Sequence, residues 1–377
     1  MNAVGIIFSN IHDQSIPEIT RRRTMASVPF GCRYRLIDFP LSNFVNSNIK
    51  NIGVITHYNY QSLMDHIGTG KDWDLATRSG GIKILPPYIT AYDNTMSAGL
   101  YSTRLEALAG ILNFISRAKE EYAVLSDCDT ICNINLKEVL KFHKEKDADI
   151  TVIAKTEALD RAMVGKQTVI ETDESGRITD IAEQTSNMSG TKLVCMNILI
   201  MSRLYLQNLV LDAIAHGYKN FYRDSMMNNV ESSNFYVYEH TGYHASITSP
   251  AEYFKCNMQL LEKDVRDDLI NNEKRPVLTK VRNSPPTKYV EGAKVKNSLL
   301  ADGCVIEGTV ENSIIFRGVH VSKGSVVRNS ILMQDTYVGK DVELNCVITD
   351  KNVMIGDGCD LSGHETRPFY IEKGAKI

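Results

Sequence analysis

Two carboxylates follow one of the most apolar short runs in the chain. The run covers residues 122–125, and Asp127 and Asp129 come just after it. Carboxylates at the carboxyl end of a strand are the ligands that proteins use to hold magnesium for phosphoryl chemistry. An Asp at such a place is as often a turn or helix-capping residue. Asp127 is therefore a candidate metal ligand, and a purely structural role stays open.

One dense basic run stands out in the sequence, formed by Arg21, Arg22 and Arg23. Guanidinium groups recognise phosphate through paired, charge-assisted hydrogen bonds. Consecutive arginines on a surface loop are also often simply solvated. The run is thus a candidate site for an anion or a partner surface, with solvation as the alternative.

Cysteine and histidine give weaker signals. Cys128 and Cys132 are four residues apart, but no second Cys or His pair completes a zinc set. His320 and His364 lie in the C-terminal part, where some hexapeptide-repeat acyltransferases carry a catalytic His. Nothing around either residue indicates a coenzyme A site. Zinc binding and acyl transfer are both disfavoured.

The elements that must position these groups alternate between apolar runs and helical patterns. The apolar runs are non-alternating, as in a parallel sheet buried on both faces, and they lie at residues 3–8, 50–57, 122–125 and 149–154. Asn135 is a candidate N-cap for the helical pattern that follows it. A doubly wound sheet binds ligands at the carboxyl ends of its strands. The loops after Phe8, His57 and Leu125 are therefore expected to form the site.

A repeat replaces this pattern near residue 290. The motif Asn, Ser or Cys, then two apolar residues begins at Asn297, Asn312, Asn329 and Asn345, at intervals of 15, 17 and 16 residues. Within the copies, apolar residues return about every six positions. An irregular β-sandwich would not keep this register over four copies, whereas a hexapeptide β-helix with three faces per coil would.

The predicted architecture is therefore α/β. A Rossmann-like domain with a mostly parallel sheet spans residues 1–270, a linker spans 271–289, and a left-handed parallel β-helix spans 290–377. The linker is polar and carries Pro276, Pro285 and Pro286.

Composition excludes several classes of function. The chain has 377 residues and a formal net charge of −3, so no domain-wide positive field exists to gather nucleic acid or anionic lipid. The longest apolar runs are strand-sized, far below the roughly 18 residues that indicate a membrane span. The chain begins with a strand pattern and no basic leader. A cytoplasmic protein with reduced thiols is expected.

Three stretches, at residues 28–49, 52–58 and 285–290, strongly resemble the glucose-1-phosphate adenylyltransferase (ADP-glucose pyrophosphorylase) family, as do the coil motifs. The resemblance covers nearly the whole chain. It implies the nucleotidyltransferase fold and the reaction of ATP with glucose 1-phosphate, which gives ADP-glucose for glycogen synthesis and releases pyrophosphate. Catalysis of this kind rests on positioning and on neutralising phosphate charge.

Most of the charged groups that the family uses are missing. The family's phosphate loop is rich in glycine and contains an arginine. It corresponds here to residues 9–16, which contain no glycine and no arginine and which include the acidic Asp13. Met25 stands at the family's phosphate-binding lysine, Gln184 at its sugar-phosphate lysine and Ser246 at its second metal carboxylate. Asp127 matches the remaining metal carboxylate as a vestige of the catalytic site.

The resemblance is therefore to the regulatory, non-catalytic subunits of this family in Gram-positive bacteria. If each lost group stabilised the transition state by about 3 kcal/mol, losing two would slow turnover about ten-thousandfold. The resemblance implies a catalytic partner subunit in a hetero-oligomer, expected to be a tetramer, or a homo-oligomer alone. No cofactor is required, and Mg²⁺ is expected only with residual catalysis.

The resemblance also implies an anionic effector, a sugar phosphate or a nucleotide. Arg21, Arg22 and Arg23 match a segment near the family's effector site, and Lys288 at the domain junction is a second candidate. Two alternatives stay open: an adenylyltransferase active on its own with a rebuilt loop, and a non-enzymatic scaffold that senses sugar phosphates.

Overall fold

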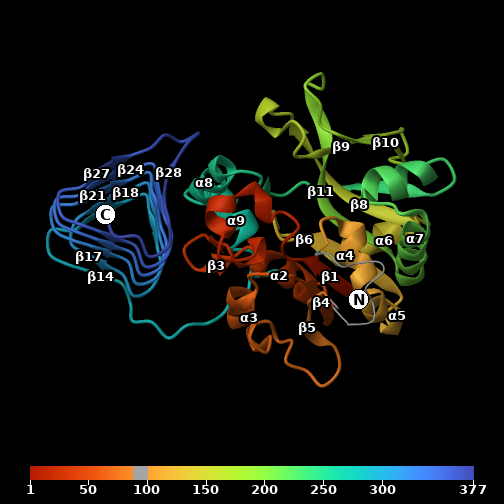
Figure 1. The fold of residues 1–377 in the computed structure, drawn as a ribbon, viewed down its shortest axis with the longest axis horizontal. Helices are drawn as coiled ribbons and strands as arrows, with labels where there is room; N and C mark the ends of the chain where they lie inside the picture. Colours follow the sequence, from red (N-terminus) through yellow and green to blue (C-terminus); the bar gives the residue numbers. More distant parts are fainter. Residues whose placement is uncertain (88–100) are drawn as a thin grey trace.

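A nine-stranded sheet forms the centre of the first domain in the computed structural model, which describes residues 1–87 and 101–377 (Figure 1). Its strands are β1 (Ala3–Phe8), β4 (Asn51–Ile55), β5 (Gly81–Leu85), β6 (Tyr122–Asp127), β8 (Ile150–Ala158), β9 (Thr168–Thr172), β10 (Ile178–Glu183), β11 (Thr191–Ser202) and β12 (Phe235–Glu239). The main path runs in the order β10-β9-β11-β6-β1-β4-β5. The four predicted apolar runs became β1, β4, β6 and β8.

Parallel pairing dominates one side of this sheet. Strand β1 pairs with β4 and β6, and β4 pairs with β5, all in parallel. On the other side, β11 pairs antiparallel with β6, β8 and β9. Every residue of β1 is buried, because helices cover both faces of the sheet.

The helices of this domain differ in what they cover. They are α1 (Pro17–Thr20), α2 (Asp38–Asn46), α3 (Gln61–Ile67), α4 (Arg104–Gly110), α5 (Leu112–Arg117), α6 (Leu136–Glu145), α7 (Arg203–His216), α8 (Pro250–Gln259) and α9 (Lys263–Leu269). One core, with Leu105, Ile115 and Leu206, lies under α4, α5 and α7. The opposite core, with Leu41 and Val139, lies under α2 and α6. The side chain of Asn135 caps α6, as predicted.

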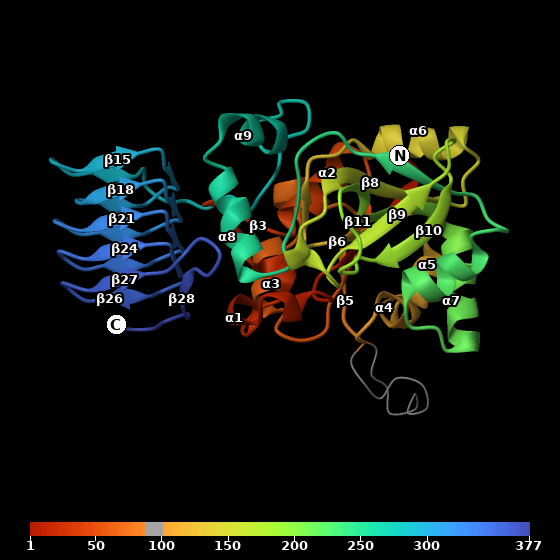
Figure 2. The same ribbon diagram turned by 90° about the horizontal axis from the view of Figure 1, so that it is seen from above.

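Two short β-ribbons and two helices lie between the central sheet and the second domain. The ribbons are β2 (Pro29–Phe30) with β3 (Tyr34–Arg35), and β7 (Thr130–Cys132) with β13 (His244–Ser246). Figure 2 shows α8 and α9 beside the β-helix. Phe254 of α8 shares one buried cluster with Ile314, Ile331 and Ile348 of the coils. The two domains therefore share a hydrophobic core.

The second domain is a parallel β-helix with three sheets. One sheet holds β14 (Lys288–Tyr289), β17 (Val305–Ile306), β20 (His320–Val321), β23 (Tyr337–Val338) and β26 (Met354–Ile355). The next holds β15 (Lys294–Lys296), β18 (Thr309–Glu311), β21 (Val326–Arg328), β24 (Glu343–Asn345) and β27 (Asp360–Ser362). The third holds β16 (Leu299–Leu300), β19 (Ile314–Ile315), β22 (Ile331–Leu332), β25 (Val347–Thr349) and β28 (Phe369–Ile371).

Asparagines turn the chain at one corner of each early coil. Asn297, Asn312 and Asn329 have left-handed φ values of 42°, 45° and 45°, which Asn tolerates better than most residues. Strand pairing aligns Arg328 with Asn345, so the residue equivalent to Asn329 is Cys346, with φ 53°. The fourth copy therefore lies one residue later than the sequence motif indicated.

The segment between the domains lies along the first domain and makes specific contacts there. The side-chain amide of Asn46 donates to the carbonyl of Pro276 at 3.0 Å, and the backbone N–H of Leu278 donates to Ser42 Oγ at 2.9 Å. Strand β14 already belongs to the first coil, because it pairs with β17.

No helix within residues 1–87 and 101–377 has the length and apolar character needed to cross a membrane.

Candidate functional site

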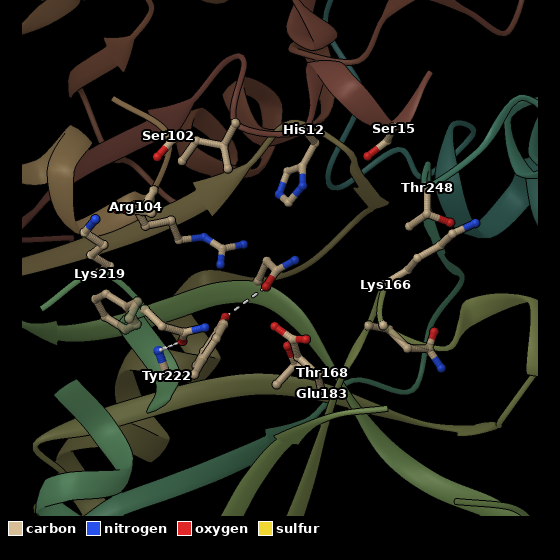
Figure 3. Close-up of a pocket in the computed structure, with 17 residues that line it drawn as sticks. His12, Ser15, Ser102, Arg104, Lys166, Thr168, Glu183, Lys219, Tyr222 and Thr248 are labelled. Carbon is tan, nitrogen blue, oxygen red and sulfur yellow. Dashed lines mark hydrogen bonds between the residues drawn. The ribbon is translucent and has the colours of Figure 1, made fainter. Parts of the chain in front are cut away.

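A pocket of about 520 Å³ opens where the loop after β1 meets the start of α4 (Figure 3). It is lined by Ile11, His12, Ser15, Ser102, Thr103, Arg104, Gly165, Lys166, Gln167, Thr168, Glu183, Asn197, Lys219, Asn220, Phe221, Tyr222 and Thr248. The loop after Phe8 contributes as predicted. The loop after His57 does not line this pocket, and His57 instead packs against the rings of Tyr58 and Tyr101.

An ionic cluster surrounds Asp127, the last residue of β6. His12 Nε2 lies 2.6 Å from Asp127 Oδ2 and 3.7 Å from Asp129 Oδ2. The guanidinium of Arg104 also pairs with Asp127, through Nη2 to Oδ2 and through Nε to Oδ1 at 3.3 Å. Two cationic side chains thus face two buried carboxyl groups.

The local fold explains why these residues meet. Pairing of β1 with β6 places Phe8 opposite Asp127, so the loop that continues to His12 passes over the carboxylate. Arg104 is the first residue of α4, whose start is fixed by a capping box between Thr103 and Glu106. The guanidinium also lies over the Tyr222 ring, with its carbon 5.4 Å from the ring centroid.

The electrostatics follow from this contact set. Burial alone would raise the pKa of Asp127, but Arg104 and His12 lower it to about 2. Burial tends to lower the pKa of His12, and the two carboxylates outweigh it, so the pKa is raised. Burial, with the nearby charge of Asp127, raises the pKa of Asp129 against the opposing effect of His12. Asp127 is therefore a carboxylate whose charge the protein itself neutralises.

Ser246 lies beside this cluster. Strand β13 pairs with β7, and Ser246 Oγ lies 3.4 Å from Asp129 Oδ2. The structure thus brings together two positions, Asp127 and Ser246, that the family resemblance assigns to metal binding. A hydroxyl stands where the second carboxylate was expected.

The other positions of lost family residues lie outside the pocket. Met25 is buried in the apolar cluster that contains Ile16 and Ile19. Gln184 is buried too, and its amide donates to the carbonyl of Asp160 at 3.0 Å, while Glu183 lines the pocket. In this structure neither Met25 nor Gln184 offers a side chain to a pocket ligand.

Asp13, in the loop after β1, is buried and lies outside the pocket lining. Its Oδ1 accepts a hydrogen bond from the backbone N–H of Met25 at 2.6 Å. Burial raises the pKa of Asp13 to about 7, against the opposing effects of that hydrogen bond and of His12. The carboxyl group of Asp13 therefore holds the Met25 backbone and does not line the pocket.

The predicted effector residues are dispersed. Arg21 and Arg22 are exposed, and Arg21 Nη1 lies 3.5 Å from Glu372 Oε2. Arg23 is buried, and its Nη2 donates to both oxygens of Asp350 in the β-helix, at 2.7 and 2.9 Å. Lys288 is exposed on β14.

The remaining sequence candidates have ordinary structural surroundings. Cys128 and Cys132 are free and buried. On the outer surface of the β-helix, His320 Nε2 lies 3.1 Å from Glu307 Oε1. His364 hydrogen-bonds to Thr366 in an exposed turn.

A magnesium ion is the metal that the family chemistry implies. His12, Asp127 and Asp129 place one ligand atom each within 4.8 Å of one another, which is close enough to share an ion. Both oxygens of Asp127 are already taken by Arg104, however, and one also by His12. Magnesium prefers oxygen ligands in octahedral geometry and is repelled by a guanidinium in its coordination sphere. The residues as arranged do not fit the ion.

Sequence reasoning missed His12, Arg104, Lys166, Lys219 and Tyr222 as site residues. The capping box Thr103-x-x-Glu106 was a readable signal for a helix start, and it would have placed Arg104 at an N-terminal turn. His12, Lys166 and Lys219 lie on loops and Tyr222 in the short helical turn Phe221–Met226, and the approach of these segments to β6 leaves no local pattern.

Both domains match known protein families. Residues 16–244 match the family model "Nucleotidyl transferase", and residues 285–367 match "GlmU-like, C-terminal hexapeptide". With the sheet order and the coils, these matches confirm the predicted fold class, a nucleotidyl transferase domain followed by a left-handed parallel β-helix.

Full-length relatives are also similar. The chain is 34% identical over 373 residues to "Glycogen biosynthesis protein GlgD" of Bacillus subtilis (strain 168), covering 98% of this chain and 96% of that protein. It is 30% identical over 360 residues to "Glucose-1-phosphate adenylyltransferase" of Bacillus anthracis and of Bacillus mycoides (strain KBAB4), covering 94% of this chain and 93% of each relative.

Proposed function

Because the chain belongs to the nucleotidyl transferase family that includes the glucose-1-phosphate adenylyltransferases and GlgD, we propose that it is a regulatory, catalytically weak or inactive subunit of ADP-glucose pyrophosphorylase. It would act in glycogen biosynthesis, in the cytoplasm, by modulating a catalytic partner subunit in a hetero-oligomer, expected to be a tetramer. In this proposal the subunit requires no cofactor of its own.

One observation carries the proposal. The carboxylate that would hold magnesium for attack on ATP, Asp127, is bonded to Arg104 and His12 within the protein. Ser246 occupies the position where the family resemblance implies the second metal-binding carboxylate. Transfer of a nucleotidyl group depends on neutralising phosphate charge, so this arrangement removes the main source of catalysis.

The test compares the chain alone with the chain mixed with a catalytic glucose-1-phosphate adenylyltransferase. We expect pyrophosphate release from ATP and glucose 1-phosphate by the isolated chain to be about ten-thousandfold slower than by the catalytic subunit. In the mixture, co-purification and a changed rate or effector response are expected.

Two outcomes would replace this proposal. Rapid turnover by the isolated chain would favour an adenylyltransferase with a rebuilt loop. No co-purification and no effect on the partner would favour a sugar-phosphate-sensing scaffold.

An anionic effector is the second part of the proposal. Cationic side chains gather in two adjoining pockets where residues 280–285 meet the β-helix and β3, the larger of about 430 Å³. Lys280, Arg282 and Arg317 line the larger pocket together with Asp335, and the adjoining pocket of about 30 Å³ adds Arg33, Arg35 and Lys351. Such a set suits a sugar phosphate or nucleotide. Arg21, Arg22 and Lys288 remain proposed effector contacts because they are exposed.

Lys351 gives this effector site a predicted pH dependence. Burial, with the nearby charges of Arg35 and Arg23, lowers the pKa of Lys351 to about 7. A bound anion favours the charged ammonium, so Lys351 takes up a proton when an anion binds above pH 7. We expect sulfate affinity to fall roughly tenfold between pH 6 and pH 9. Calorimetry in buffers of different ionisation enthalpy measures both the affinity and the proton uptake.

Matched variants test this assignment. Lys351→Met should remove the pH dependence, and Lys323→Met, at an exposed β-helix turn, should keep it. His66 lines the same pocket, but burial lowers its pKa, so it titrates below Lys351. A wild-type affinity that does not vary between pH 6 and pH 9 would contradict the assignment.

A further inference from the structure

Both carboxylate oxygens of Asp127 have a cationic partner from the chain itself. Oδ1 accepts from Nε of Arg104, and Oδ2 accepts from Nη2 of Arg104 and lies 2.6 Å from His12 Nε2. The Arg104 side chain is 13% exposed and that of Asp127 is 1% exposed. A divalent ion could reach this carboxylate only by displacing a nearly buried guanidinium.

Displacement of Arg104 is opposed by the helix cap that fixes its backbone and by the Tyr222 ring, which is itself held in place. The capping box of Thr103 and Glu106 fixes the backbone from which the side chain extends. The guanidinium lies over the Tyr222 ring, and the Tyr222 hydroxyl donates to Asn197 at 2.9 Å. Asn197 holds a left-handed φ of 55° in β11, so this support is built into the sheet. The cation is a fixed part of the site.

The pocket beyond Asp127 carries further positive charge. Lys166 and Lys219 line it, and within residues 1–87 and 101–377 neither ammonium has a carboxylate partner. Nη1 of Arg104 has no hydrogen bond within the same residues. Figure 3 shows Arg104 and His12 pointing into the pocket, with Lys219 on the side of Arg104 and Lys166 on the far side, its ammonium directed toward Thr248. Glu183 is the carboxylate among the lining residues.

We propose that Arg104 permanently replaces the divalent cation, so that this pocket binds a phosphorylated sugar without magnesium and does not react with it. This inference rests on the proposed function, because it gives the altered catalytic pocket of a regulatory subunit a ligand. The phosphate binds Nη1 of Arg104, and Lys219 and Lys166, at the two ends of the pocket, add positive potential. Hydroxyls and amides around them, from Ser15, Thr168 and Gln167, suit sugar hydroxyls.

The first test measures glucose 1-phosphate binding to the isolated full-length chain by calorimetry, once in EDTA and once in millimolar Mg²⁺. We expect the two dissociation constants to agree within about twofold, because the charge is supplied by Arg104. Tightening of tenfold or more by Mg²⁺, or no binding in either buffer, would overturn the proposal. This measurement needs no variant.

The second test follows Mn²⁺ by electron paramagnetic resonance. The wild type should bind no Mn²⁺ at this site, whereas Arg104→Ala, shown to be folded by circular dichroism, should gain one site and lose about tenfold in glucose 1-phosphate affinity without metal. Lys219→Ala is the matched control, since Lys219 lines the pocket without pairing to Asp127, and it should gain no Mn²⁺ site. A wild-type Mn²⁺ site that Asp127→Asn removes would overturn the proposal, as would a folded Arg104→Ala protein that gains none.

These tests are separate from those of the proposed function. Binding is measured on the isolated chain, whereas the regulatory role is measured on the rate of a partner. A chain that leaves its partner unchanged but binds glucose 1-phosphate without magnesium would refute the regulatory role alone.

Discussion

Replacing Arg23 with Met is expected to lower the free energy of unfolding by about 3–5 kcal/mol, the usual cost of leaving one partner of a buried ion pair unpaired. Asp350 accepts hydrogen bonds from Arg23 at 2.7 and 2.9 Å, and both side chains are at most 4% exposed. The Tyr370 hydroxyl also donates to Asp350, at 2.9 Å, but it brings no charge. Denaturant titration followed by Trp73 fluorescence and by circular dichroism measures the loss.

Two comparisons make the Arg23 result specific. Arg22→Met, at the adjacent exposed position, should change stability by no more than about 0.5 kcal/mol. The double variant Arg23→Met, Asp350→Leu should recover much of the lost stability, since it also removes the buried carboxylate that Arg23→Met leaves unpaired. Equal stabilities of the Arg23→Met and Arg22→Met proteins would show that the buried pair contributes nothing.

Restoring the family's lysine at position 25 is expected to destabilise the protein without restoring catalysis. Met25 is 1% exposed and packs in the apolar cluster that contains Ile16 and Ile19, so Met25→Lys forces an ammonium into that cluster or makes it lose its proton. The expected cost is about 3–5 kcal/mol. Pyrophosphate release should stay at the wild-type level, because Asp127 remains paired with Arg104.

Met25→Leu is the matched control for this change. It keeps the apolar character and nearly the volume, and should cost less than about 1.5 kcal/mol. A Met25→Lys protein that is as stable as Met25→Leu and turns over glucose 1-phosphate would show that the loop after β1 can still support catalysis.

Local sequence patterns were sufficient to predict four strands of the central sheet and the β-helix. Non-alternating apolar runs located β1, β4, β6 and β8, since strands buried on both faces need apolar residues at every position. The Asn motif located the β-helix, because each coil repeats the same turn. No local sequence pattern predicted that β11 lies between β6 and β8 and pairs antiparallel with both. Pairing direction depends on contacts between distant segments.

The sequence was sufficient to predict where the candidate site lies, but not which side chains contact Asp127 there. Asp127 was found because a carboxylate at a strand end is a local feature. Its partners come from other segments, His12 from 115 residues earlier and Arg104 from 23 residues earlier. Arg23 was expected on a surface because charged residues are rarely buried unless paired, and its partner lies 327 residues away. Charge neutralisation in the interior is decided by the tertiary fold.

The first coil of the β-helix has a further consequence, for self-association. Among the residues that the structure describes, strands β14, β15 and β16 pair with the coil after them and with no other strand, so their other backbone edge faces outward (Figure 2). Such an edge can template a strand of another molecule and start end-to-end fibre growth. Lys288, Lys294 and Lys296 are exposed on it, and their like charges would oppose the stacking of a second copy. These lysines would keep the solenoid finite, and their removal should show as turbidity at high protein concentration.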